Sequence, residues 1–178
     1  RFARLFWTQF FGALNDNFFK NVLVLMITYR GVQLWGLGPK SLVPLAGGVF
    51  ILPFLLFSAV SGQMADRYEK SFLIRVAKFT ELAFMALAGI GFLLDSFYLL
   101  IVVLFLMGAQ SAFFGPLKYG ILPSLLKPLD LVRGNAYVGT GTFVAILSGT
   151  ILGGAVVSIQ NSSVFAALGR VLVALSGL

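Results

Sequence analysis

The chain has 178 residues, of which 59% are hydrophobic and 11% charged, and its mean hydropathy is +0.98. These values exclude an ordinary soluble domain, in which about half of the residues are apolar and about a quarter are charged. The formal net charge of +7 comes from scattered residues and not from basic runs interleaved with aromatic residues, which argues against a nucleic-acid partner. The composition therefore predicts a membrane protein.

The residue types that the chain lacks exclude several kinds of functional site. The chain contains no cysteine and no histidine, so disulfides, thiol chemistry and histidine metal ligands are excluded. No pair of carboxylates with obvious acid and base roles is present either. We therefore expect neither an enzyme nor catalytic or metal-binding residues in this segment, and any coupled sodium ion or proton would have to use carboxylates and lysines.

Six apolar stretches follow one another, each close to the roughly 20 residues that cross a bilayer. The predicted helices span 5–29, 42–61, 72–94, 97 to about 116, 135–159, and a sixth that begins near Val164 and is truncated. The third and fourth helices are separated only by Asp95 and Ser96, and the fifth and sixth by 160–163, so each pair is expected to form a tight hairpin. Because the chain begins at Arg1 and stops within an apolar run, we expect a piece of a longer protein.

Lysine and arginine residues are distributed unevenly between the two sides of the predicted membrane. Eight of them lie on the side of the N-terminus, whereas Arg30 and Lys40 lie on the other. Cytoplasmic loops carry the excess of basic residues in multi-pass proteins. The bias predicts a cytoplasmic N-terminus.

The stretch FFGALNDNFFKN, residues 10–21, places polar groups in the middle of the first predicted helix. At about 100° per residue, one face of this helix carries Leu5, Gln9, Gly12, Asp16, Lys20, Leu23 and Ile27, and the opposite face carries Phe11, Leu14, Phe18, Val22 and Leu25. A carboxylate at a helix centre costs roughly 2.5–3.5 kcal/mol on insertion scales, so this polar stripe must face protein or water. It either joins helices or lines a cavity; we favour a cavity for Gln9, Asn15, Asp16, Asn17 and Lys20, because packing rarely needs two ionisable groups at this depth.

The fourth predicted helix carries Gln110, Phe114 and Lys118 at a spacing of four, and then Gly115, Pro116, Gly120 and Pro123, which are expected to kink or unwind it. Counted from Lys127 and Asp130, Lys118 lies roughly 14 Å deep, and counted from Leu5, Asp16 lies roughly 16 Å deep at the helical rise. Asp16 could therefore pair with Lys118, or with Lys20 on its own helix. Lys118 could instead bind a phosphate or extend to the headgroups. Gln110 and Lys118 join the predicted cavity.

The stretch SGQMADRYEK, residues 61–70, is predicted to connect the second and third helices. Gly62 would permit a tight turn, and Asp66, Arg67 and Lys70 would contact helix ends or face solvent. A G-x-x-x-D-R-x-x-K segment at this point of a six-helix unit resembles the signature loop in the N-terminal half of major facilitator superfamily transporters.

Three further motifs resemble the lysophospholipid transporters of that superfamily: LNDNFFKN, FGPLKYGILPSLL and GNAYVGTGTFVAILSGTILGG. The resemblance covers nearly the whole chain. It implies that residues 1–178 form the N-terminal bundle of six transmembrane helices and that a second bundle follows. It also implies a multi-pass protein of the bacterial inner membrane that moves lysophospholipids, such as lysophosphatidylethanolamine, to the inner leaflet for reacylation.

The resemblance further implies residue roles and partners. Asp16, Asn17 and Lys118 would belong to the cavity, whereas Gly62, Asp66, Arg67 and Lys70 would form a conformational latch. A sodium ion or proton could drive transport, and acyltransferase and acyl-carrier-protein synthetase domains could follow in the same chain. The family often has an acidic residue where this chain has Gly139, so that role would be absent or displaced. The alternatives are a transporter of another amphipathic substrate or drug, and a membrane anchor for acyltransferase domains.

Two features are expected to be structural. Asn135, Gly139, Thr142, Gly149 and Gly153 lie along one side of the fifth helix, which predicts close helix packing or a sliding surface. Glu81 on the third helix is expected to pair with Lys78, three residues earlier.

Overall fold

The computed structural model describes residues 2–159, and the described part is all helical, with no β-strand. Its elements are α1 (Phe2–Tyr29), α2 (Pro39–Arg67), α3 (Lys70–Leu93), α4 (Phe97–Gly120), α5 (Leu122–Leu125), η1 (Pro128–Asp130) and α6 (Leu131–Ile159). The five long helices match the first five predicted spans, with differences at their ends. The predicted sixth helix and the hairpin at 160–163 lie outside the described residues.

Four of the described helices are long and apolar enough to cross a membrane, namely α2, α3, α4, and η1 together with α6. α1 has the length, with 28 residues, but its polar stripe makes it less apolar than the others. It nevertheless runs beside α6, from Phe2 near Gly134 to Met26 near Val157, so it lies at the same depth. The four apolar helices support a multi-pass membrane protein, and α1 packs along α6 within it.

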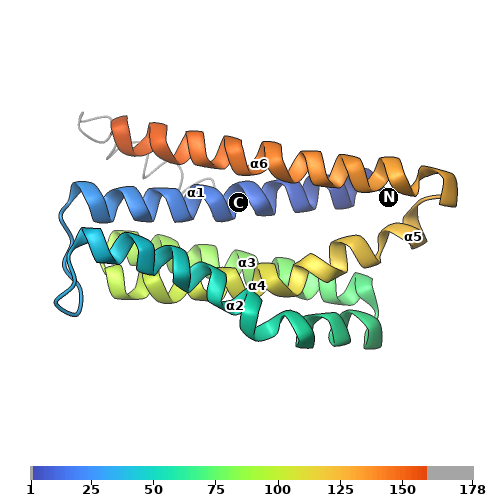
Figure 1. The fold of residues 1–178 in the computed structure, drawn as a ribbon, viewed down its shortest axis with the longest axis horizontal. Helices are drawn as coiled ribbons and strands as arrows, with labels where there is room; N and C mark the ends of the chain where they lie inside the picture. Colours follow the sequence, from blue (N-terminus) through green and yellow to red (C-terminus); the bar gives the residue numbers. More distant parts are fainter. Residues whose placement is uncertain (1, 160–178) are drawn as a thin grey trace.

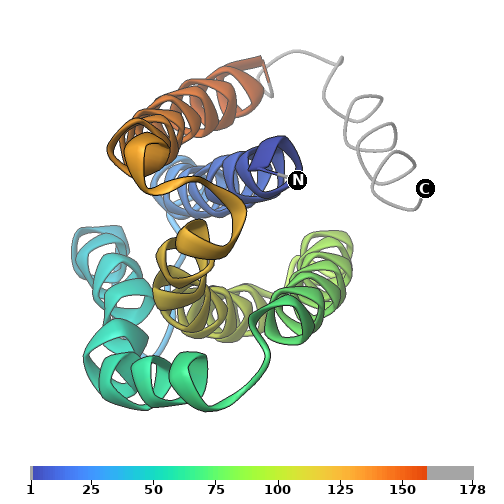
Figure 2. The same cartoon turned by 90° about the vertical axis from the view of Figure 1, so that its right-hand side faces the viewer.

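The helices run nearly side by side, with α1 and α6 as one pair and α4 between α2 and α3 as a second group (Figures 1 and 2). α4 has the central place, which explains why many of its residues are buried, including Leu100, Val103 and Leu104. The N-terminus, the α2–α3 junction and α5 lie at one end of the bundle (Figure 1). The basic residues of those segments therefore gather at one end, and Arg30 and Lys40 lie at the other.

Glycines bring α1 and α6 close together. The face of α6 that meets α1 is a run of small or β-branched residues with a spacing of three or four: Gly134, Val138, Gly141, Ala145, Gly149, Gly153 and Val157. At Gly149 an added Cβ would meet the Leu14 carbonyl oxygen, and at Gly153 it would lie 3.1 Å from the Phe18 carbonyl oxygen. The predicted packing role is confirmed for these two glycines. Gly139 does not take part, because nothing lies within 4 Å of a Cβ placed there.

At the end of the bundle opposite the N-terminus, α1 and α3 terminate with the same backbone motif. In α1, the Val32 amide donates to the Ile27 carbonyl across Gly31, whose φ is +61°. In α3, the Ser96 amide donates to the Gly91 carbonyl across Asp95, whose φ is +48°. These are Schellman endings, in which a residue in the left-handed conformation lets the chain reverse. The predicted tight hairpin between the third and fourth helices is confirmed.

The two endings are joined by an ion pair between Arg30 and Asp95, whose side chains are 42% and 66% exposed. We expect Asp95→Asn to lower the free energy of unfolding by less than about 1 kcal/mol, because exposed ion pairs contribute little and asparagine also tolerates the left-handed conformation. Thermal unfolding of the purified protein would measure this. A loss of several kcal/mol would contradict the assignment of the pair to a solvated surface.

Two sequence-based predictions about helix breaks were wrong. α2 continues through Gly62 to Arg67, because a single glycine costs only about 1 kcal/mol in a helix whose following residues are good helix formers. α4 likewise continues through Gly115 and Pro116, whereas the predicted break at Gly120 and Pro123 is confirmed, because α4 ends at Gly120 and α5 begins at Leu122. Pro123 follows within the first turn of α5, where proline is favoured.

Candidate functional site

The polar stripe of α1 faces the interior of the bundle. Gln9, Gly12 and Asp16 are all buried, and so are Leu5, Leu23 and Ile27 at its two ends. Of the predicted opposite face, Phe11 is exposed, whereas Val22 is buried against Val157 of α6. The helical periodicity therefore identified the inward face correctly, but the apolar back is partly covered by α6.

Asp16 belongs to a chain of polar contacts that links three helices. One carboxylate oxygen, Oδ2, accepts a hydrogen bond from the Ser111 hydroxyl of α4, while Oδ1 is buried and accepts no hydrogen bond from any described residue. The Ser111 oxygen also lies 3.4 Å from Gln110 Oε1, and Gln110 Nε2 donates to Glu81 Oε2 (3.4 Å) on α3. Glu81 accepts from Lys78 Nζ at 2.6 Å. We call these five residues, Asp16, Ser111, Gln110, Glu81 and Lys78, the polar network.

The ion pair of the polar network lies directly against α1. A Cβ placed on Gly12 would lie 2.7 Å from Lys78 Nζ and 3.4 Å from both carboxylate oxygens of Glu81. The absence of a side chain at Gly12 therefore gives the pair room between α3 and α1. The Phe114 ring of α4 lies 5.1 Å from Lys78 Nζ, within the range of a cation–π contact. The predicted pairing of Glu81 with Lys78 is confirmed, and the structure adds that it is joined to Asp16.

Lys20 and Lys118 do not pair with Asp16 in the structure, contrary to both predicted ion pairs. Lys20 Nζ donates to Asn17 Oδ1 (3.0 Å) and lies 5.0 Å from the Phe50 ring centre of α2. Lys118 Nζ lies 5.1 Å from the Tyr119 ring centre, and no described carboxylate is within ion-pair distance of it. Sequence spacing could not decide this, because a flexible lysine side chain reaches several partners at similar cost.

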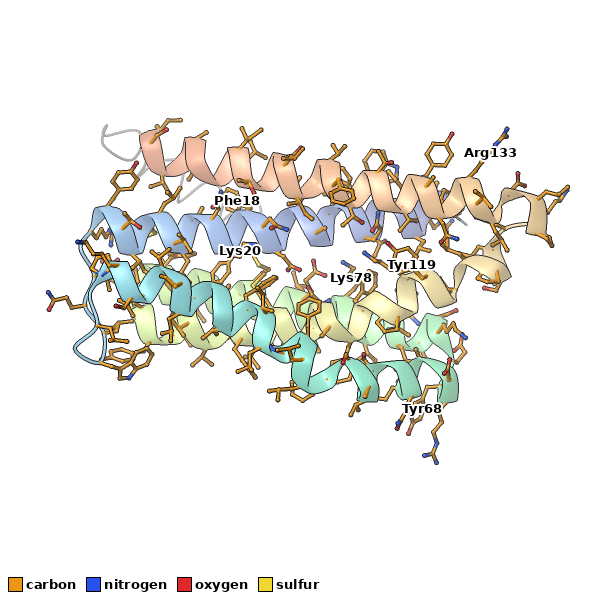
Figure 3. All side chains as sticks on the ribbon, viewed as in Figure 1. Phe18, Lys20, Tyr68, Lys78, Tyr119 and Arg133 are labelled. Carbon is orange, nitrogen blue, oxygen red and sulfur yellow. The ribbon has the colours of Figure 1, made fainter. Side chains whose placement is uncertain are left out.

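Lys20 and Lys118 resemble Lys78 in being half-buried beside an aromatic ring. They differ from it because neither forms an ion pair with a described carboxylate. Figure 3 shows Lys20 and Lys78 in the middle of the bundle's length, and Tyr119 nearer to the end where α2 joins α3. Half-buried ammonium groups without a carboxylate partner can bind an anionic group such as a phosphate.

Of the three other predicted cavity residues on α1, Gln9 and Asn17 make side-chain hydrogen bonds within the bundle, and Asn15 does not. Gln9 Nε2 donates to the Val138 carbonyl (3.2 Å), and its Oε1 accepts from Thr142 (2.9 Å), so Gln9 joins α1 to α6. Asn17 Nδ2 donates to the Ala13 carbonyl on its own helix (2.8 Å). Asn15 is half-buried and makes no side-chain hydrogen bond to another described residue. Gln9 therefore supports packing, whereas Asn17 holds Lys20.

The predicted latch residues lie at the junction of α2 and α3. Gly62, Asp66 and Arg67 are in the last turns of α2, not in a loop, and Lys70 is the first residue of α3. Asp66 and Arg67 are exposed, and neither forms an ion pair with another described residue. A latch role for these residues stays a prediction.

Sequence reasoning missed Ser111 and the role of Thr142 as a partner of Gln9. Ser111 follows Gln110 directly, yet a serine in an apolar helix commonly bonds to its own backbone and gave no signal. No group of three or more His, Cys, Asp or Glu side chains that could hold a metal ion occurs between residues 2 and 159. Of the charged groups present, Asp16 has the free buried oxygen that a proton or a small cation could occupy.

The comparisons with known proteins agree with a transport segment. The chain is 31% identical over 147 residues to the lysophospholipid transporter LplT of Photorhabdus laumondii, with 83% of this chain and 34% of the relative covered. The chain is similar to lysophospholipid transporters. The LplT of Salmonella enteritidis is 33% identical over 146 residues, and that of Escherichia coli strain SE11 is 31% identical over 147 residues, each with 82% of this chain and 34% of the relative covered.

The chain thus spans about a third of the length of these relatives. They are named transporters and not enzymes, in agreement with the expectation for this segment. No family model and no solved structure matches the chain.

Proposed function

We propose that this chain is part of a transporter that moves lysophospholipids, such as lysophosphatidylethanolamine, across the bacterial inner membrane by alternating access. The observation that carries the proposal is the similarity to lysophospholipid transporters over more than four fifths of the chain, 82% or 83% for the relatives named above. We further propose a major facilitator fold, in which the described helices belong to the N-terminal half, the N-terminus is cytoplasmic and a second bundle completes the path. The α2–α3 junction would be its latch.

The charges of the bundle fit an amphipathic substrate. Lys20 and Lys118 are half-buried cations at different levels of the bundle, and each would bind the phosphate of a lysophospholipid headgroup at a different point of its path. The aromatic rings of Phe50 and Tyr119 lie beside them and would contact the apolar part of the same molecule. A lysine side chain within the bilayer has a high free-energy cost, and such residues usually serve a substrate or an ion. This supports a role for both lysines in the transport path.

Asp16 is our candidate for the coupling residue. Within the polar network two carboxylates, Asp16 and Glu81, face the single ammonium group of Lys78, and that group pairs with Glu81. One negative charge is therefore left without an ion-pair partner, at Asp16. We propose that a proton or a sodium ion occupies the free oxygen of Asp16 during transport, because an isolated carboxylate in an apolar interior is strongly disfavoured.

Uptake of labelled lysophosphatidylethanolamine into spheroplasts tests this function. We expect Lys20→Gln and Lys118→Gln in the full-length protein to lower the initial rate at least tenfold, because each removes a charge that meets the phosphate. Asp16→Asn is expected to abolish any dependence on sodium or proton gradients. Thr28→Ala is the control on α1, since Thr28 is exposed and its hydroxyl donates to the Val24 carbonyl of the same helix.

The results also separate the alternatives. Unchanged uptake in both lysine variants at equal expression would exclude the headgroup assignment. If no lysophospholipid competes but other amphipathic compounds do, the substrate belongs to another class. If the intact protein supports no uptake while attached acyltransferase domains remain active, the segment is a membrane anchor.

A further inference from the structure

Three side chains bring oxygen atoms together between α1 and α4: Asp16, Ser111 and Gln110. Ser111 donates its single hydroxyl proton to Asp16 Oδ2, so this proton is not available to Gln110 Oε1, which lies 3.4 Å from the Ser111 oxygen. Asp16 is only 7% exposed, and its Oδ1 accepts no hydrogen bond from any described residue. We call Asp16 Oδ1, the Ser111 oxygen and Gln110 Oε1 the oxygen cluster.

The amide of Gln110 is oriented so that its oxygen faces this cluster. Its Nε2 donates to the Ala77 carbonyl (3.3 Å) and to Glu81 Oε2 (3.4 Å). Both partners are acceptors, to which an amide nitrogen can donate and an amide oxygen cannot. The amide oxygen therefore lies on the other side, towards Ser111, and because Gln110 is only 9% exposed, little water reaches it. The cluster thus holds more acceptors than the described donors can satisfy.

The ammonium groups nearest to the oxygen cluster have other partners. Lys78 Nζ forms its ion pair with Glu81 Oε2, at 2.6 Å. Lys20 Nζ, one helical turn beyond Asp16 on α1, donates to Asn17 Oδ1 (3.0 Å). Neither lysine forms an ion pair with Asp16. The oxygen cluster therefore carries one negative charge, and no described side chain supplies its counterion.

We propose that the oxygen cluster binds one sodium ion, with Asp16 Oδ1, the Ser111 oxygen and Gln110 Oε1 as ligands. A cation can satisfy all three oxygens at once, whereas a proton on Asp16 would be shared with one further acceptor. One carboxylate with two neutral oxygens suits a single positive charge, whereas a calcium site gathers about six to eight oxygens and usually several carboxylates. The spacing of 3.4 Å between two of the oxygens suits the small sodium ion better than potassium.

The bound sodium ion would join α1 to α4. Gln110 also bonds to α3 through the Ala77 carbonyl and Glu81, so ion binding would hold three helices in one arrangement. Loss of the ion would leave the Asp16 carboxylate without a counterion and favour a conformation in which water reaches it. The use of this ion in transport rests on the coupling role proposed for Asp16, whereas sodium binding itself is measurable without transport.

Sodium binding to the purified full-length protein tests the site directly. We expect radioactive sodium to bind to the wild type, to be displaced by unlabelled sodium far better than by potassium, and to be lost in Asp16→Asn. Ser111→Ala and Gln110→Leu are each expected to weaken sodium binding at least fivefold, because each removes one ligand and keeps the carboxylate. Ser158→Ala on α6 is the matched control, since Ser158 is exposed and its hydroxyl donates to the Ala155 carbonyl.

Thermal unfolding separates loss of an ion ligand from loss of folding. The wild type is expected to unfold at a higher temperature in sodium chloride than in potassium chloride of equal ionic strength, because a ligand that binds the folded state stabilises it. Ser111→Ala should keep the unfolding midpoint in potassium chloride and lose most of the increase in sodium chloride. Equal sodium binding by the wild type, Ser111→Ala and Gln110→Leu would overturn the site. Stabilisation of the wild type by acid but not by sodium would also overturn it.

Uptake of labelled lysophosphatidylethanolamine, measured with and without a sodium gradient, tests the transport role separately. If sodium binds as expected and uptake does not depend on the gradient, the sodium site stands and the coupling role of Asp16 fails. If uptake is intact and the wild type binds no sodium, the oxygen cluster is not a sodium site and the proposed transport function stands.

Discussion

Gly149→Leu is expected to destabilise the bundle more than any other single substitution on α6. A Cβ at this position would meet the Leu14 carbonyl oxygen and lie 3.0 Å from the Phe18 amide nitrogen, and these are backbone atoms of α1 that cannot move separately. Overpacking of this kind typically costs about 1–3 kcal/mol and sometimes more. The measurement is the thermal unfolding midpoint of the purified protein, together with its yield in the membrane.

Gly154→Leu provides the control for this experiment. Gly154 lies on the same helix, one residue after Gly153, but nothing is within 4 Å of a Cβ placed there. We expect its unfolding midpoint to stay close to that of the wild type, because substitutions away from packed sites are usually within about 0.5 kcal/mol. Equal destabilisation by the two leucines would show that the effect belongs to loss of glycine itself and not to the α1–α6 contact.

The second large effect is expected at the ion pair of the polar network. Glu81→Gln leaves the ammonium group of Lys78 without its counterion, in the middle of the bundle and against Gly12. Removing one partner of a fully buried pair costs about 3–5 kcal/mol. Here the side chains of Lys78 and Glu81 are 26% and 15% exposed, so we expect a smaller loss, of about 2–3 kcal/mol.

A double-mutant cycle separates this charge effect from loss of packing. Lys78→Met and Glu81→Met are each expected to lower the unfolding midpoint, whereas the double variant should recover most of the loss, because it leaves no unpaired charge. The four proteins are compared by thermal unfolding at equal detergent concentration. Additive losses in the double variant would mean that the two side chains act independently and that the pair is not a unit.

The sequence predicted the helices well because the bilayer requires long apolar stretches, and the structure keeps all five that fall within residues 2–159. The inward face of α1 was also predictable, since Asp16 and Gln9 recur at helical spacing with Leu23 and Ile27. The errors lie at Gly62 and Pro116, where a residue that weakens an isolated helix was read as its end. In both cases the surrounding helix was strong enough to continue.

The partners of the polar side chains were harder to predict. The similar depths of Asp16 and Lys118 in the predicted membrane suggested an ion pair between them. Depth does not determine which faces of two helices meet. The actual partner is Ser111, and Lys78 and Glu81 reach the same region from α3. These contacts depend on the rotation of α3 and α4 about their axes, which packing determines and a single sequence does not reveal.

The position of these partners along the chain has a consequence for synthesis and membrane insertion. Ser111 follows Asp16 by 95 residues, and the α6 groups that bond to Gln9 and Asn21 follow them by 129 or more. When α1 leaves the ribosome, none of these groups has been made. We therefore expect α1 to insert poorly when it leaves the ribosome and to be stably accommodated only after α4 and α6 have been translated.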